Sequence, residues 1–312
     1  MVVVERYIEK AKVLLEALPY ILRFRGKIFV IKFGGAAMVK EELKSSFAED
    51  ILLLHLIGIH VVVVHGGGPA ISRQLERLGV QSNFVQGMRV TDAETMQVVE
   101  EVLVGRVNKN IVSLIKKHGG KAVGISGKDG GLITAKKMEL APAPDGTPAG
   151  DLGFVGEVAH LNPEILHTLA RGGFIPIVAP VGADDQGNTY NINADVAAGQ
   201  LASSLEAEKL ILMTDVEGVK DKDGKIYSRL TAREAEAAIA NGIIGGGMIP
   251  KVQCCIKALR EGAGKGHIID GRIPHATLLE IFTDMGIGTE MFLAGRSASV
   301  APTNVADGGS SS

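Results

Sequence analysis

The chain has 312 residues, of which 46% are hydrophobic and 22% charged, and its formal net charge is −2. This length suits one large domain or two lobes around a sizeable core, and the charge offers no basic surface for nucleic acid or anionic membrane. No apolar stretch reaches the roughly 20 residues that span a bilayer, so nucleic-acid-binding and membrane-spanning classes are excluded.

The first predicted element is a helix over residues 5–24. Its apolar residues recur at alternating spacings of three and four, as in a coiled-coil seam; they are Ile8, Ala11, Leu15, Leu18 and Leu22. Pro19 falls inside this pattern and should end or kink the helix, because proline lacks the N–H that the helix needs. The seam could pack on its own domain or on another subunit.

The N-terminus also bears on the compartment. Its first ten residues include Glu5 and Glu9 and lack the charged-then-apolar layout of a secretory signal. The two cysteines, Cys254 and Cys255, are adjacent, so they cannot link distant segments and are too few for a metal site. We therefore expect no bound metal and a cytoplasmic protein, or a plastid stromal one if a transit peptide has been removed.

Five short apolar runs predict strands, and they lie at 27–32, 60–64, 121–126, 174–179 and 209–214. Helical patterns lie between them, at 40–57, after Asp92, at 162–172 and at 196–205, whereas residues 128–160 indicate irregular loops and short hairpins. Strands that alternate with helices are typical of a mainly parallel sheet. We predict an α/β fold, a three-layer α-β-α sandwich with an extra N-terminal helix.

Glycine loops follow the first two strands. Lys32 is followed by Phe33 and two glycines, and such a turn exposes bare N–H groups beside a cation, as a phosphate site would. The alternative is a structural turn whose lysine reaches solvent. The second strand ends in His65-Gly66-Gly67-Gly68, and Pro69 opens a helix, an arrangement that favours anion binding. No Walker or dinucleotide-binding pattern occurs there.

Later polar residues have competing interpretations. Arg89 precedes a helix that Thr91 or Asp92 should cap, and it could grip a carboxylate or be a surface charge. In an extended segment, Asn191, Asn193 and Asp195 would share one side, but Asp195 could instead cap the helix 196–205. Lys251 follows the third glycine loop, 245–247, and could be a solvated helix lysine.

These loops, with Lys32, Asp195 and Lys251, all fall near the carboxyl ends of predicted strands, where open α/β sheets bind ligands. Amide donors and lysine charges suit the stabilisation of a phosphoryl group in transfer. If the acceptor is a carboxylate, no catalytic base is needed, because the carboxylate is already ionised at pH 7.

Taken together, the motifs resemble the amino acid kinase family over residues 27–293. The motifs are Lys32-Phe33-Gly34-Gly35, His65-Gly66-Gly67-Gly68, Gly87-Met88-Arg89-Val90-Thr91, Asn191-Ile192-Asn193-Ala194-Asp195, Thr214-Asp215-Val216 and Gly246-Gly247-Met248-Ile249-Pro250-Lys251. The Arg-Val-Thr and Asn-x-Asn-Ala-Asp combination resembles the members that act on N-acetylglutamate.

The resemblance implies transfer of the γ-phosphoryl group of ATP, bound with Mg²⁺, to the side-chain carboxylate of N-acetyl-L-glutamate in arginine biosynthesis. It implies that the catalytic residues are Lys32, Lys251, Asp195, Gly35 and Gly67. It implies that the substrate is bound by Gly67, Gly68, Arg89, Asn191 and Asn193. It implies that the nucleotide is bound by Thr214, Asp215, Val216, Gly218, Val219, Lys220, Ile243, Ile244 and Gly245.

The N-terminal helix and the segment around Glu280 resemble the arginine-inhibited, hexameric members of the family. This likeness implies a homo-hexamer built as a trimer of dimers and an L-arginine site formed by Tyr20, Lys209, His275, Glu280 and Gly286. Residues 269–275 resemble members that bind a PII-type signal protein. The implied organisation is an oligomerisation helix at 1–25, an N-acetylglutamate-binding and dimerisation lobe at 26–190, an ATP- and arginine-binding lobe at 191–297, and a disordered tail at 298–312.

Two alternatives stay open. One is a family member that acts on glutamate or aspartate, although a free α-ammonium group would favour a carboxylate where the predicted loop offers Asn191 and Asn193. An aspartate kinase would also carry a long regulatory region after Thr289. The other is a non-catalytic arginine-sensing homologue, which the presence of both lysines and Asp195 disfavours.

Overall fold

The computed structural model describes residues 2–85, 87–140, 150–283 and 286–295. Its main strands are β1 (Ile28–Phe33), β2 (His60–His65), β5 (Ala122–Ser126), β8 (Ile175–Ala179), β11 (Lys209–Thr214), β12 (Arg229–Thr231), β13 (Lys265–Asp270) and β14 (Thr289–Phe292). Smaller strands are β3 (Phe84–Val85), β4 (Met88–Arg89), β6 (Ile133–Lys137), β7 (Val155–Leu161), β9 (Val181–Ala183) and β10 (Thr189–Ile192).

The α-helices are α1 (Val2–Glu16), α2 (Leu18–Phe24), α3 (Glu41–Leu56), α4 (Gly68–Arg77), α5 (Ala93–Glu100), α6 (Asn108–Lys117), α7 (Glu164–Arg171), α8 (Ala194–Ser204), α9 (Ala232–Ala240), α10 (Met248–Arg260) and α11 (Ala276–Ile281). Short 3₁₀ turns are η1 (Gly35–Met38) and η3 (Asp129–Gly131), and η2 (Glu101–Val107) is a π-helix between α5 and α6.

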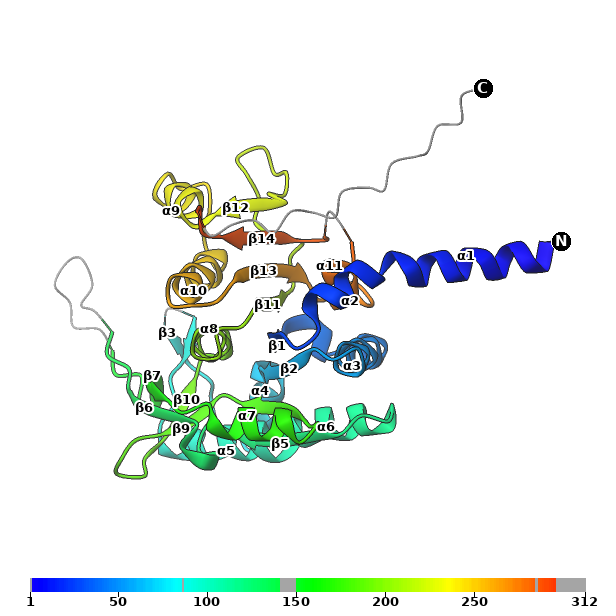
Figure 1. The fold of residues 1–312 in the computed structure, drawn as a ribbon. Coiled ribbons are helices and arrows are strands. Elements are labelled where there is room, and N and C mark those ends of the chain that lie inside the picture. The colour runs from blue at the N-terminus through cyan, green and yellow to red at the C-terminus, as the bar shows by residue number, and fades with distance from the viewer. Residues whose placement is uncertain (1, 86, 141–149, 284–285, 296–312) are drawn as a thin grey trace, which may run out of the picture.

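Among the described residues, eight strands form one sheet in the order β12-β14-β13-β11-β1-β2-β8-β5 (Figure 1). Neighbouring strands are parallel except for the β13–β14 pair, so the prediction of a mainly parallel sheet is confirmed. Strands from both predicted lobes contribute to this sheet. The predicted lobe boundary between residues 190 and 191 falls inside β10, which belongs to a small barrel with β6, β7 and β9.

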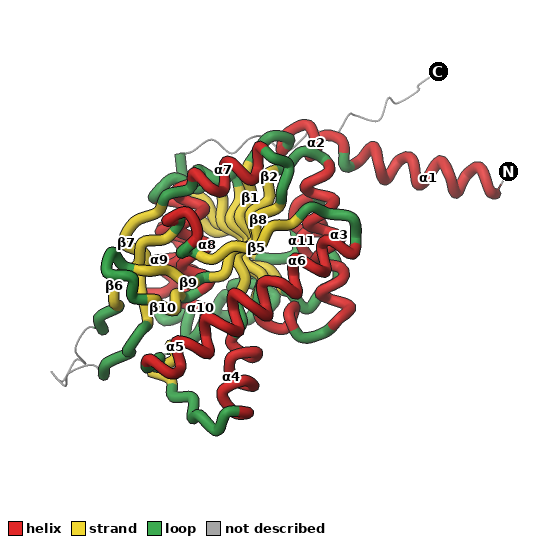
Figure 2. Tube along the Cα trace, turned by 90° about the horizontal axis from the view of Figure 1, so that it is seen from below, coloured by secondary structure: helices red, strands yellow, loops and turns green. Residues whose placement is uncertain are grey.

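The sheet is covered by helices on both faces, as Figure 2 shows. Alternate residues of a strand face opposite sides: Val30 packs in the core under α8 and α10, whereas Phe29 and Ile31 pack in the core under α3 and α6. All of these side chains are fully buried. The predicted three-layer sandwich is therefore confirmed.

Several predicted boundaries need correction. The single helix expected at 5–24 is two helices separated at Ala17, because Pro19 near the start of α2 cannot continue α1. Residues 128–160, expected to form irregular loops and short hairpins, do include the antiparallel β6–β7 pair. The strand predicted at 209–214 matches β11 residue for residue.

The helix α1 points away from the body of the molecule (Figure 1). Its predicted seam does not pack on its own domain, since Ile8 is 49% exposed and Leu15 64% exposed. Within the described residues, no helix has the length and apolarity needed to cross a membrane. The tail predicted at 298–312 lies outside the described residues.

Candidate active site

Two lysines meet one carboxylate at the carboxyl edge of the sheet. The Nζ atom of Lys32, near the end of β1, lies 3.0 Å from Asp195 Oδ1, and the Nζ atom of Lys251 on α10 donates to Asp195 Oδ2 at 2.5 Å. All three side chains are no more than 20% exposed. The solvated alternatives for both lysines are therefore excluded, and the three predicted catalytic side chains lie together.

The electrostatics of the cluster favour an ionised Asp195. Burial alone would raise the pKa of its carboxyl, but the adjacent charges of Lys32 and Lys251 outweigh burial, so the pKa is lowered. The cluster therefore carries two cations against one anion, which leaves one positive charge for an anionic ligand.

The interpretation of Asp195 as a helix cap is wrong. Asn193 is the N-cap of α8, because its side-chain oxygen accepts hydrogen bonds from the N–H groups of Asp195 and Val196 at 2.9 and 3.3 Å. Since β10 ends at Ile192 and α8 begins at Ala194, the segment is not extended through residue 195, which was the condition for the three polar side chains to share one side. Asn193 caps the helix, and this leaves the carboxylate of Asp195 for the lysines.

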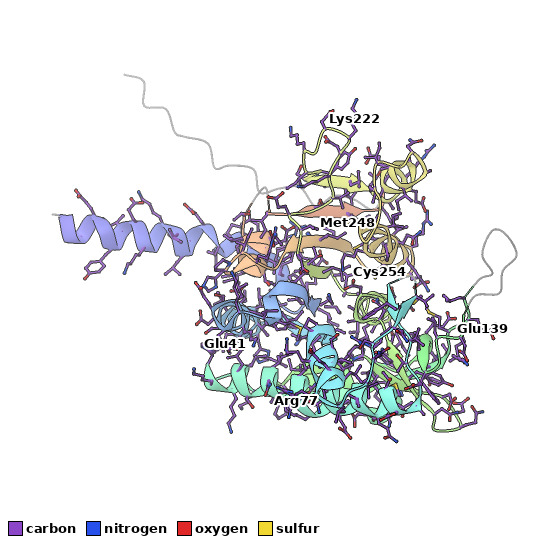
Figure 3. All side chains as sticks on the ribbon, turned by 180° about the vertical axis from the view of Figure 1, so that it is seen from behind. Glu41, Arg77, Glu139, Lys222, Met248 and Cys254 are labelled. Atoms are coloured by element: carbon purple, nitrogen blue, oxygen red, sulfur yellow. The ribbon has the colours of Figure 1, made fainter. Side chains whose placement is uncertain are left out.

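The close packing of α8 on α10 aligns this cluster. A Cβ atom at Gly199 would lie 2.6 Å from the Sγ atom of Cys254, so a side chain there would push the helices apart. Cys254, labelled in Figure 3, donates a hydrogen bond to the backbone carbonyl of Asp195 at 2.9 Å. Burial raises the pKa of Cys254 to about 12, so its thiol stays protonated and remains a donor.

Both glycine loops reach the same edge. Gly34 leaves room for the side chain of Lys32, and Gly35 has a φ of +64°, which favours glycine. The carboxylate of Asp215 lies where a Cβ atom of Gly35 would be. Gly67 belongs to the second loop, and it lines a hollow of about 160 Å³ together with Lys32, Gly35 and Asp195.

A second cavity of about 220 Å³ adjoins this hollow, and the two share the glycine loop 66–68 and residues 193–194. The predicted substrate residues all line it: Gly67, Gly68, Arg89, Asn191 and Asn193. No Asp or Glu of the described chain lines this cavity. The structure therefore gathers every predicted substrate residue next to the two lysines.

Arg89 is the fixed cation of this cavity, and it is only 7% exposed. Its guanidinium donates to the hydroxyl oxygens of Ser72, at 2.8 Å, and of Ser82, and it stacks over the ring of Phe84. Burial lowers its pKa, but an arginine stays charged at pH 7. Because no described carboxylate pairs with it, Arg89 can bind a carboxylate of a ligand.

The segment predicted to contact the nucleotide begins at the carboxyl end of β11. Thr214 and Gly218 are buried, and the side chains of Val219 and Ile244 belong to the hydrophobic core, so these residues could meet a nucleotide only through their backbones. The other predicted members are exposed, and they are Asp215, Val216, Lys220, Ile243 and Gly245.

Part of the predicted effector set forms a buried cluster. The Nζ atom of Lys209 lies 2.9 Å from His267 Nε2, and His267 Nδ1 lies 2.6 Å from the carboxylate of Glu280. A Cβ atom at Gly286 would lie 2.7 Å from Glu280 Oε2, so a larger residue would crowd the carboxylate. Burial lowers the pKa of Lys209 to about 8.

The other two effector candidates are placed differently. Tyr20 packs edge-to-face on Phe282, with ring centroids 6.0 Å apart. His275 lies 2.7 Å from Asp50 of α3 through its Nδ1 atom. Its described ion-pair partners are Asp50 and Glu49, so the structure places His275 against α3 rather than in the Lys209 cluster.

Sequence reasoning missed several residues of these sites. His267, at the centre of the Lys209 cluster, lies in the buried strand β13. The only sequence signal for its role was a polar side chain at a position that the strand buries. Ser72 and Ser82, which hold Arg89, carry no motif signal. The described residues contain no group of three or more His, Cys, Asp or Glu side chains that could hold a metal ion.

A family model decides the classification, since the model of the amino acid kinase family matches residues 27–270. The chain belongs to the amino acid kinase family. This family member is 60% identical to the acetylglutamate kinase of Syntrophobacter fumaroxidans over 94% of this chain and 99% of the relative. It is 58% identical to the acetylglutamate kinase of Syntrophus aciditrophicus over 93% of this chain and 99% of the relative.

Solved structures of related folds agree with this classification. N-acetylglutamate synthase from Neisseria gonorrhoeae, complexed with coenzyme A and N-acetyl-glutamate, is similar with a TM-score of 0.80 and 26% identity, over 90% of this chain and 63% of the synthase. The chain thus spans less than two thirds of that larger protein. Carbamate kinase from Giardia lamblia has a TM-score of 0.62 at 18% identity, over 86% of this chain and 99% of the kinase, and shows the fold alone.

Proposed function

We propose that the protein transfers the γ-phosphoryl group of ATP, supplied as its Mg²⁺ complex, to the side-chain carboxylate of N-acetyl-L-glutamate, an early step of arginine biosynthesis. The observation that carries this proposal is the contact of Lys32 and Lys251 with Asp195 beside the cavity that holds Arg89. The acetylglutamate kinases that share more than half of its residues support the same reaction.

Each group of the site has a task in this proposed reaction. The acceptor carboxylate is already ionised, so the chain must position it and neutralise the charge that develops on the phosphoryl oxygens. Lys32 and Lys251 supply that charge, Asp195 orients both ammonium groups, and the amides of Gly35 and Gly67 donate to phosphoryl oxygens. The phosphates of ATP carry the Mg²⁺ ion.

The cavity lining favours an acetylated substrate over a free amino acid. Arg89 would bind the α-carboxylate, and the neutral amides of Asn191 and of the backbone would face the acetamido group. A free α-ammonium group would be buried without a counter-charge, since no described acidic residue lines the cavity.

Acyl-phosphate formation tests this proposal. With ATP and hydroxylamine as the trap, we expect much faster hydroxamate formation from N-acetyl-L-glutamate than from glutamate or aspartate, because the buried ammonium group of the free amino acids is unpaired. Equal or faster turnover of free glutamate would refute the substrate assignment, and absence of turnover with every acid would favour a non-catalytic sensor.

We further propose that L-arginine inhibits the enzyme at the cluster of Lys209, Glu280 and Gly286, with Tyr20 and His275 as the further contacts that the sequence resemblance implies, and that α1 links dimers into a hexamer. The exposed seam of α1 supports this assembly, because a row of apolar side chains needs a partner. The carboxylate of Glu280 supports a guanidinium ligand. Binding of a PII-type protein stays a prediction of the sequence resemblance.

Removal of α1 should produce a smaller, active assembly that arginine inhibits less. The deletion should end at residue 16, because Phe24 at the end of α2 is buried in the core. Light scattering gives the mass, and the hydroxamate assay with added arginine gives the inhibition. Leu15→Glu should act like the deletion, whereas the control Lys10→Ala, outside the seam, should not. An unchanged mass would contradict the assembly proposal.

A further inference from the structure

A buried polar pair beneath the second glycine loop has no role in the reaction described above. His65, the last residue of β2, and Asn108, the first residue of α6, are both 0% exposed. The Nδ1 atom of His65 lies 2.8 Å from the carbonyl oxygen of Gly66, and its Nε2 atom lies 3.2 Å from the side-chain nitrogen of Asn108. Buried polar groups are retained at a cost, so these contacts need a reason.

The hydrogen-bond partners determine which histidine nitrogen carries the proton. The Nδ2 atom of Asn108 also lies 2.8 Å from the carbonyl oxygen of Ile177 and 3.2 Å from that of Ile125. Carbonyl oxygens only accept, so the two hydrogens of the Asn108 amide are shared among these carbonyls and His65 Nε2, and the amide nitrogen cannot itself accept a hydrogen bond from the ring. His65 Nε2 is therefore the acceptor, and Nδ1 carries the proton and donates to Gly66. Burial lowers the pKa of His65 to about 4, so the ring is neutral at pH 7.

The bond to Gly66 sets the direction of the next amide. The carbonyl of Gly66 and the N–H of Gly67 belong to one planar trans peptide and point in opposite directions. A carbonyl held toward His65 therefore directs the Gly67 N–H away from the core and toward the loop's open side. Within the described part of the chain this N–H has no hydrogen-bond partner, although Gly67 lines both the cavity and the lysine hollow.

The π-helix η2 also packs against this glycine loop. The backbone N–H of Asn108 donates to the carbonyl of Leu103, a bond between residues five apart that stacks them on one face. In an α-helix the same two residues would lie about 140° apart around the axis. Leu103 lies where a Cβ atom of Gly67 would be, and Asn108 reaches His65. One unusual helical turn thus contacts the loop through Leu103 and the histidine that precedes the loop through Asn108.

We propose that Asn108 and His65 are positioning residues, which fix the Gly66 carbonyl so that the Gly67 amide points at the phosphoryl group in transfer. This inference rests on the proposed kinase function. It adds a hydrogen-bond relay that runs from the π-helix through the histidine to the glycine loop.

Two substitutions of His65 separate this role from simple packing. In His65→Asn the side-chain amide keeps a donor at the δ position for Gly66, whereas in His65→Gln the nearest nitrogen lies at the ε position and that bond is lost. We expect kcat to fall about 10²-fold in His65→Gln, as for loss of one transition-state donor, and less than about tenfold in His65→Asn. The KM for ATP should change little in either, because the amide acts on the transferring group.

Hydrogen–deuterium exchange of residues 61–75 provides a second readout that does not need turnover. The loop should exchange faster in His65→Gln than in His65→Asn. Equal kcat values and equal exchange in the two variants would overturn the inference. If the wild type phosphorylates an acid other than N-acetylglutamate, the proposed substrate fails, but the ratio of the two variants on that acid still decides this inference. If no acid is turned over, the exchange comparison decides it alone.

Asn108→Ser keeps the test decisive if His65→Gln does not fold. It leaves His65 in place but removes the amide that supports the Nδ1-protonated tautomer from the Nε2 side, so only the Gly66 carbonyl still favours that tautomer. We expect kcat to fall about tenfold with faster exchange of the loop, a smaller effect than direct loss of the donor. Wild-type kcat and wild-type exchange in a folded Asn108→Ser protein would contradict the relay.

Discussion

Alanine at position 32 or at position 251 is expected to lower kcat at least about 10²-fold, the usual effect of removing one group that stabilises the transition state. In the proposed reaction, charge is spread over the oxygens of the phosphoryl group in transfer, and each lysine would place one ammonium group beside them. Both lysines are held by Asp195, at 3.0 and 2.5 Å, so neither can be replaced by a mobile surface cation. Steady-state kinetics with varied ATP and varied N-acetylglutamate measure the effect.

Lys257→Ala is the matched control for this prediction. Lys257 lies on the same helix as Lys251, but its side chain is 61% exposed and pairs only loosely, at 3.9 Å, with Glu261. We expect its kcat to stay within about twofold of the wild type, since an exposed i,i+4 pair contributes little. If Lys32→Ala and Lys251→Ala lose less than tenfold in kcat while folded, the two lysines would have structural roles only.

Much of the fold follows from the sequence because the buried parallel strands are continuous apolar runs. The run at 60–64 is almost purely valine, and the structure extends it by only one residue, to His65. Thr91 and Asp92 were likewise the two predicted N-cap candidates, and the structure selects Asp92, whose side chain accepts from the N–H of Thr95. Both signals are local, since they depend on neighbours within a few residues.

The arrangement of the site depends on contacts between distant segments, and sequence patterns do not encode these directly. Asn193 and Asp195 are both residue types that commonly cap a helix. Only the three-dimensional positions of Lys32 and Lys251 show that Asp195 pairs with the lysines while Asn193 caps α8. The local sequence around Gly199 likewise does not predict that α8 and α10 approach each other closely at this residue. The sequence resemblance, which carries such contacts implicitly, predicted the residues of this cluster correctly as neighbours.

The π-helix η2 was also not predicted from the sequence, for a different reason. Residues 93–117 have the apolar pattern of one helix, and periodicity does not distinguish one wide turn within it. Yet this turn brings Leu103 and Asn108 onto one face beneath the glycine loop. A buried asparagine in an apolar helical pattern was the signal that could have indicated it, because a buried amide needs partners.

Asp195→Asn is expected to destabilise the protein as well as inactivate it. Removal of the carboxylate leaves two cations close together and largely buried, and loss of one partner from a buried ion pair costs about 3 kcal/mol. Without their anchor both ammonium groups should shift, and a displacement of about 1 Å can lower kcat about 10²-fold. Urea unfolding and steady-state kinetics measure the two effects. Asp184→Asn is the control for kcat. It removes a carboxylate from the turn after β9, outside the cluster, and should leave kcat close to the wild-type value.

A triple variant separates the charge effect from the loss of packing. Lys32→Met, Asp195→Asn and Lys251→Met together remove every charge of the cluster and keep similar volumes. Because the desolvation of all three ions no longer has to be offset, we expect the triple variant to recover most of the unfolding free energy lost in Asp195→Asn, while it stays inactive. If the triple variant is as unstable as the single one, lost packing rather than unpaired charge explains the instability.

The pH dependence of stability gives the sign of the Asp195 contribution. Its native pKa is lower than the unfolded value of about 3.9, since Lys32 and Lys251 favour the ionised form. A group with a lowered native pKa stabilises the fold fully above the unfolded pKa and loses that contribution as the pH falls through the native pKa. The stability difference between wild type and Asp195→Asn should therefore be constant near pH 7 and shrink below about pH 4. A difference that grows as the pH falls would mean that Asp195 is protonated in the native cluster, and the two lysines would then face a neutral group.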